Sequence, residues 1–97
     1  MNVDAEIYLK QLFGFFDGNT EALKSLIGEL SKEKFYKKIR DAVYEKVDTE
    51  DDMVLSKKQM VDLIKDLWDE EQGPLQEDKF EIIDTFLKTN YGFFSLN

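Results

Sequence analysis

A helical repeat of apolar residues limits what this chain can fold into more than any other feature of its sequence. Two segments place apolar side chains at positions i, i+3, i+4 and i+7, the spacing that gathers them on one face of an α-helix. These positions are Leu23, Leu26, Ile27 and Leu30 in the first segment, and Met60, Leu63, Ile64 and Leu67 in the second. One proline and five glycines in 97 residues leave few points that would interrupt a helix. The sequence therefore predicts an all-α fold.

Three further segments carry a related apolar pattern, one near each end of the chain and one between the two segments above. Two of them carry shorter apolar stripes, namely Phe35, Ile39, Ala42 and Val43, and Phe80, Ile83 and Leu87. The segment from Ile7 to Phe16 is apolar over a wide arc, so we expect its helix to be buried on more than one side. We predict five short amphipathic helices near residues 3–16, 20–29, 32–47, 57–71 and 75–90. The short loops between them favour antiparallel neighbours and one compact helical bundle over residues 1–97.

Polar residues and glycines at the ends of these segments predict where the helices begin and end. Ser56 and Gln59 have the spacing of a capping box, and Leu55 can pack against Met60 one turn into the helix. The other predicted boundaries are the turn at residues 17–20, Ser31 as an N-cap, and the Gly73-Pro74 pair.

The chain contains no cysteine and no histidine. Their absence removes disulfides, thiol nucleophiles, the commonest metal ligand and the usual general base near neutral pH. The serines have no histidine to activate them, and Ser31 and Ser56 are already explained as helix caps. We therefore expect a protein that is not an enzyme and that needs no organic cofactor.

The formal net charge is −8, from 21 acidic and 13 basic residues. A surface of this charge repels phosphate backbones, so we expect no binding to nucleic acid. No apolar stretch approaches the roughly 20 residues that cross a bilayer, and the acidic residues at the N-terminus are unlike those of a signal peptide. We expect a cytoplasmic protein that does not enter a membrane.

An acidic stretch lies between the third and fourth predicted helices. Asp48, Glu50, Asp52, the Val54 carbonyl, Ser56 and Gln59 occupy the first, third, fifth, seventh, ninth and twelfth places of a continuous segment. In this spacing the segment resembles the EF-hand, whose loop wraps Ca²⁺ with oxygen ligands. The resemblance implies a Ca²⁺ site with Asp48, Glu50, Asp52 and Ser56 as candidate ligands.

Two positions of this segment depart from the EF-hand pattern. Met53 stands where the motif uses glycine, and Gln59 stands where it uses a bidentate carboxylate. The alternative interpretation is a solvated junction between two helices, in which acidic residues near the first helical turn are favoured by the helix dipole.

Charge is distributed unevenly along the chain. Residues 32–46 carry six basic side chains against three acidic ones, whereas residues 62–84 carry nine acidic side chains against Lys65 and Lys79. This pattern predicts complementary helices that pack side by side, within one chain or across a dimer. The alternative is an acidic face that binds a basic protein or imitates the charge of DNA.

Large apolar residues outside the regular stripes are candidates for contact with a partner. These are Trp68 at the edge of the fourth stripe and Phe93, Phe94 and Leu96 near the C-terminus, which either cover the core or bind a partner. We therefore predict a small acidic protein-interaction module, such as an adaptor, an inhibitor or an accessory protein, that binds a partner or self-associates. The alternatives are a divergent EF-hand-like Ca²⁺ binder and a DNA-mimicking inhibitor.

Overall fold

Five helices account for most of the chain in the computed structural model, which describes residues 3–50 and 52–90. They are α1 (Val3–Asp17), α2 (Thr20–Ile27), α3 (Lys32–Glu50), α4 (Lys57–Gln72) and α5 (Glu77–Asn90). The predicted all-α fold is confirmed, and the described residues contain no strand. None of these helices combines the length and the apolar character that crossing a membrane requires.

Three helix ends differ by two residues or more from those predicted. Helix α3 continues to Glu50, so that the first part of the acidic stretch is helical rather than a loop. Helix α2 ends at Ile27 because Gly28 adopts a φ of 57°, a left-handed value that favours glycine. Helix α5 begins at Glu77, three residues after Pro74, instead of at residue 75.

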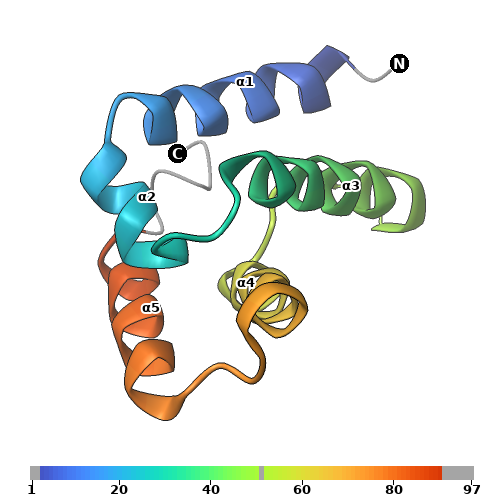
Figure 1. Cartoon of the computed structure of the whole chain (residues 1–97). Helices are drawn as coiled ribbons and strands as arrows, with labels where there is room; N and C mark the ends of the chain where they lie inside the picture. Colours follow the sequence, from blue (N-terminus) through green and yellow to red (C-terminus); the bar gives the residue numbers. More distant parts are fainter. Residues whose placement is uncertain (1–2, 51, 91–97) are drawn as a thin grey trace.

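The helices pack around one core as a closed ring (Figure 1). Helix α1 lies against α2 and α3, α4 lies against α3 and α5, and α2 closes the ring by packing on α5. Figure 1 shows α1 and α3, which are not consecutive in the chain, running across the view in opposite senses, whereas α4 is seen nearly along its axis. Helices α3 and α4 are thus inclined to each other.

Aromatic side chains join α1 to α3. Phe16 packs edge to face against Phe35 with ring centroids 5.5 Å apart, and Phe13 stacks on Tyr36 with centroids 4.2 Å apart. The Tyr36 hydroxyl donates a hydrogen bond of 2.8 Å to the Asp17 carboxylate at the end of α1. The prediction that the first helix is buried on more than one side is wrong: its buried residues, Ala5, Tyr8, Leu9, Leu12 and Phe16, follow one face at helical spacing, and Ile7 is 49% exposed.

Ion pairs between α3 and α4 explain part of the uneven charge distribution. The Lys38 ammonium lies 2.8 Å from the Glu70 carboxylate, and the Lys34 ammonium lies 3.4 Å from Glu71. The same Glu71 carboxylate accepts a hydrogen bond of 3.1 Å from the backbone N–H of Ser31. The predicted pairing of complementary helices therefore occurs within one chain.

The helix caps predicted at Ser56 and Ser31 are confirmed. The Ser56 hydroxyl accepts a hydrogen bond of 3.1 Å from the Gln59 N–H, and the Ser56 N–H donates one of 2.8 Å to the Gln59 side chain, which completes the capping box. Ser31 caps α3 by accepting a hydrogen bond of 3.2 Å from the Lys34 N–H. Asn19 precedes α2, but its side chain donates to the Phe15 carbonyl of α1 instead.

We expect Ser56→Ala to lower the free energy of unfolding by about 1 kcal/mol, because the substitution leaves the first turn of α4 without its acceptor. Urea denaturation followed by circular dichroism measures the change. The matched control is Ser25→Ala, since the exposed Ser25 hydroxyl bonds only to the Glu21 carbonyl within α2. Equal stability of Ser56→Ala and the control would contradict the role of the cap.

Candidate functional site

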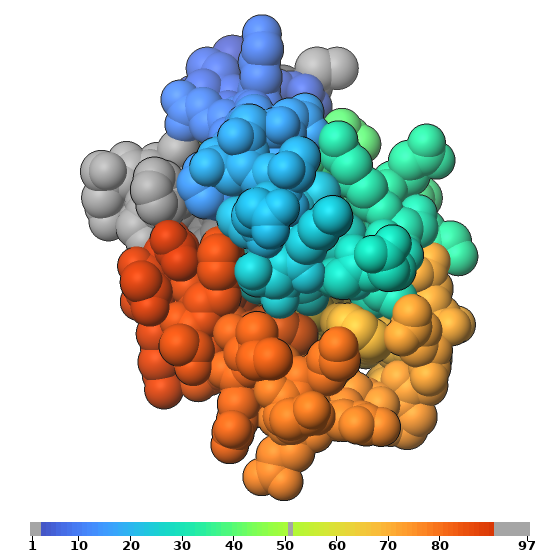
Figure 2. Space-filling view, turned by 60° about the vertical axis from the view of Figure 1, so that its left-hand side comes forward, coloured from blue at the N-terminus to red at the C-terminus, as the bar shows by residue number. Residues whose placement is uncertain are grey.

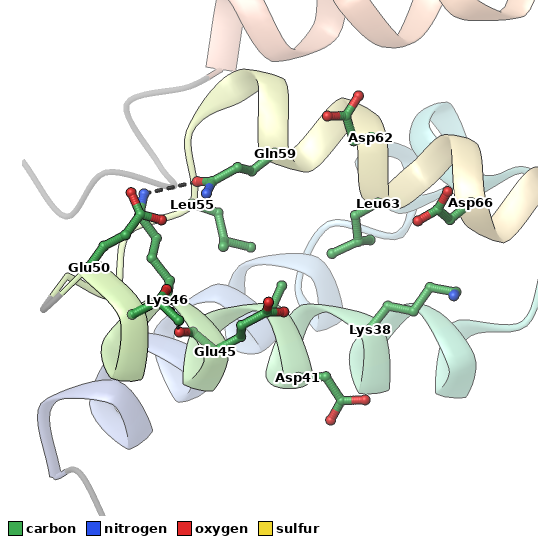
Figure 3. Close-up of a pocket in the computed structure, with 12 residues that line it drawn as sticks. Lys38, Asp41, Glu45, Lys46, Glu50, Leu55, Gln59, Asp62, Leu63 and Asp66 are labelled. Carbon is green, nitrogen blue, oxygen red and sulfur yellow. Dashed lines mark hydrogen bonds between the residues drawn. The ribbon is translucent and has the colours of Figure 1, made fainter.

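A groove with a volume of about 430 Å³ lies between α3 and the start of α4. Its α3 wall is formed by Lys38, Asp41, Ala42, Glu45, Lys46, Thr49 and Glu50. The opposite wall is formed by Leu55, Gln59, Asp62, Leu63 and Asp66. Figure 3 shows Leu55 and Leu63 extending toward α3 from this opposite wall. Because both leucines are almost completely buried, the groove has an apolar floor.

Carboxylates outnumber ammonium groups along the rim of the groove. Of its five carboxylates, two form i,i+4 ion pairs with exposed lysines of the same helix, Asp41 with Lys37 and Asp62 with Lys58. The other three, Glu45, Glu50 and Asp66, are exposed and have no ion-pair partner within residues 3–50 and 52–90. The groove is therefore negative where it opens to solvent.

Lys46 is the unexpected residue of this groove, because its side chain is only 10% exposed. Its ammonium group donates to the Gln59 side-chain oxygen at 2.9 Å and to the Val54 carbonyl, and it lies 3.5 Å from the Asp52 carboxylate. Figure 3 shows Lys46 reaching from α3 to Gln59 on α4. A buried charge is tolerated only when its hydrogen-bonding groups find partners, and here three oxygens provide them. The end of α3 is thereby joined to the start of α4.

Asp52 holds the connecting segment in a tight local turn. One carboxylate oxygen accepts hydrogen bonds from the N–H groups of Met53 at 2.7 Å and Val54 at 3.3 Å. The N–H groups of Val54 and Met53, together with the Lys46 ammonium, hold the pKa of Asp52 below its usual value. These contacts therefore persist above the usual pKa of an aspartate and are lost as the pH falls through the lowered pKa.

Some of the oxygen atoms of the EF-hand-like segment lie close together, but they surround the ammonium group of Lys46. Asp52, the Val54 carbonyl and Gln59, the fifth, seventh and twelfth places of the EF-hand-like segment, all contact the ammonium group. Asp48 and Glu50 lie in the exposed last turn of α3, and the Ser56 hydroxyl serves the capping box. No cluster of three or more acidic side chains suited to a metal ion occurs in the described ranges. Ca²⁺ binding stays a prediction.

Of the residues predicted to contact a partner, the structure describes Trp68 alone. Trp68 is only 8% exposed and belongs to the core. Phe93, Phe94 and Leu96 lie outside the described residues.

The sequence analysis did not single out Lys46, although the sequence carries a signal for its burial. Lys46 continues the buried stripe of Phe35, Ile39 and Val43 at helical spacing, and these four are the buried residues of α3. Lys46 is in register with an apolar stripe and is followed by a carboxylate six residues later, at Asp52, and by an amide thirteen residues later, at Gln59. This combination indicates a buried ammonium group.

Comparisons with known proteins add no constraint on the groove. No protein-family model matches the chain, and neither curated proteins nor solved structures gave a match. What the groove can bind therefore follows from its own residues, an apolar floor within a negative rim.

We expect Lys46→Met to lower the free energy of unfolding by about 1–3 kcal/mol, because it keeps the apolar stem but withdraws the donor from three oxygens. Urea denaturation measures the change, with Lys10→Met on the exposed face of α1 as the control. The control should stay within about 0.5 kcal/mol of the original chain. A Lys46→Met protein as stable as the control would show that the buried ammonium contributes nothing.

A Ca²⁺ titration followed by proton–nitrogen correlation NMR tests the cation prediction. Because Lys46 already brings a positive charge to these oxygens, we expect the amide resonances of Val54 and Gln59 to stay in place at millimolar Ca²⁺. A saturable shift that disappears when Asp48 and Asp52 are both replaced by Ala would instead support the Ca²⁺ site predicted from the sequence.

Proposed function

We propose that this protein is a non-enzymatic interaction module whose α3–α4 groove binds a basic, amphipathic segment of a partner protein. The observation that carries the proposal is an apolar floor beside three carboxylates, those of Glu45, Glu50 and Asp66, that form no ion pair with any described residue. Both lysines of the groove are engaged within the chain, Lys38 with Glu70 and Lys46 with the segment before α4. A positive charge for the rim must therefore come from another molecule.

The dimensions of the groove suit side chains of a partner segment. A volume of about 430 Å³ lies in the range of small ligand pockets, about 300–1,000 Å³. In the proposed complex an aliphatic side chain of the partner covers Leu55 and Leu63. Lysine or arginine side chains on either side of it meet Glu45 and Glu50 on one wall and Asp66 on the other.

The charge of the whole protein supports the same partner chemistry. A net charge of −8 attracts a basic segment over a distance, which raises the association rate, and it repels nucleic acids. The absence of histidine and cysteine supports a binding role over catalysis, and the absence of cysteine suits the reducing cytoplasm in which we place the protein.

The proposal is tested by binding of a fluorescently labelled amphipathic peptide of lysine, leucine and alanine, measured by anisotropy. Replacement of the three unpaired groove acids (Glu45→Gln, Glu50→Gln, Asp66→Asn) should weaken binding roughly tenfold or more, because three exposed ion pairs of up to about 1 kcal/mol each are lost. Ala42→Leu, which narrows the groove without changing its charge, should also weaken binding.

Two controls separate the groove from general attraction to an acidic protein. The first makes the same change of charge on α5 (Glu77→Gln, Asp78→Asn, Glu81→Gln), whose residues do not line the groove, and should leave binding nearly unchanged. The second is a peptide of the same composition in which lysine and leucine are permuted so that no apolar face forms. Equal loss of binding in the α5 control, or equal binding of the permuted peptide, would refute the groove as the site.

A further inference from the structure

A second pocket lies on another part of the surface, where α2, α4 and α5 meet. Its volume is about 230 Å³, and its walls include Lys24 of α2, Trp68 of α4, and Lys79 and Ile82 of α5. Figure 2 shows this face, with a small part of α4 visible in the seam between α2 and α5. None of the residues that line it belongs to the α3–α4 groove.

The indole N–H of Trp68 is a buried donor that no described residue accepts. Trp68 is only 8% exposed, and its Nε1 atom has no hydrogen-bond partner in the part of the chain that the structure describes. Buried N–H groups are nearly always paired, so each exception calls for an explanation. Trp68 lines the pocket, but its Nε1 atom has almost no surface open to solvent while the Lys79 side chain lies over the ring. An acceptor atom of a ligand would supply the missing partner once that side chain moves.

The pocket is also positive, although the protein as a whole is acidic. Lys24 and Lys79 are exposed lysines of α2 and α5, and neither forms an ion pair with any described residue. The Lys79 ammonium lies 5.5 Å from the centre of the Trp68 ring, in the position of a cation–π contact. No carboxylate of the described residues lines this pocket. An anionic acceptor would therefore meet the ammonium groups of Lys24 and Lys79, and the Trp68 N–H once Lys79 leaves the ring.

The remaining walls of the pocket, formed by Ile82, Ile83 and Gly28, are apolar and limit the size of the ligand it can hold. Ile82 is 56% exposed, which is unusual for a large aliphatic side chain, and Ile83 beside it is buried. Gly28 keeps one side open, since a Cβ atom there would lie 3.7 Å from Cη2 of Trp68. A cavity of about 150 Å³ can hold benzene, so a pocket of about 230 Å³ has room for one ring or a short branched chain.

We infer that this pocket binds a small apolar carboxylate. The carboxylate accepts hydrogen bonds from the Trp68 N–H and from Lys24 and Lys79, and the apolar body packs against Ile82. Because the long, exposed side chain of Lys79 lies over the indole, it moves aside to admit the ligand and then closes on the carboxylate. The site is independent of the proposed α3–α4 groove.

Titration with cyclohexanecarboxylate, observed by proton–nitrogen correlation NMR of the protein, tests this site. Trp68 is the only tryptophan of the chain, so its indole N–H gives a single resonance. We expect this resonance to move downfield and to saturate as the ligand is added, because the N–H gains an acceptor. Two comparison compounds, cyclohexanecarboxamide without the charge and acetate without the apolar body, should bind roughly tenfold or more weakly.

Substitutions of exposed lysines complete the test without disturbing the core. Lys24→Gln combined with Lys79→Gln should weaken binding of cyclohexanecarboxylate roughly tenfold. Lys10→Gln combined with Lys58→Gln makes the same change of charge away from the pocket and should leave binding unchanged. An indole resonance that does not move, that moves equally with the amide, or that responds equally in both double variants would overturn the inference.

Discussion

The structure depends on one stripe of α3 that is buried between α1 and α4. Phe35 meets Phe16 of α1 at one end of the stripe, and Ile39 and Val43 are completely buried along its middle. Lys46 continues the stripe at the other end, where its ammonium is bound by the segment that leads into α4. This stripe positions α1 and α4, the two helices that pack on α3. On the opposite side of the ring, α2 packs on α1 and on α5. Figure 1 shows this order of helices around the core.

The two candidate binding sites lie at seams of this ring and have opposite electrostatic character. The α3–α4 groove is negative because its lysines are already paired within the chain, whereas the pocket at Trp68 is positive because Lys24 and Lys79 are not. The distinction is invisible in the net charge of −8. It arises from which charges the packing of the helices neutralises and which it leaves free.

Much of the fold could be predicted from the sequence because it depends on local patterns. The apolar spacing determines the five helices, and the hydrogen bonds of Ser56 with Gln59 involve residues only three positions apart. The partners of Lys46 and Trp68 depend instead on how α3, α4 and α5 approach one another, which no local pattern specifies. Only the three-dimensional structure therefore reveals the apolar floor at Leu55 and Leu63. The same is true of the Trp68 N–H, which has no partner among the described residues.

The ammonium of Lys46 occupies the place among oxygen ligands where an EF-hand-like segment would hold a metal ion, and it cannot diffuse away. A bound ion is present only in proportion to its concentration in solution, whereas a group carried by the chain has a high and constant effective concentration. The contacts of Lys46 thus join α3 to α4 without a metal ion. Protonation of Asp52 would remove the one charged partner of this ammonium group, whereas the oxygens of Val54 and Gln59 would still accept its hydrogen bonds.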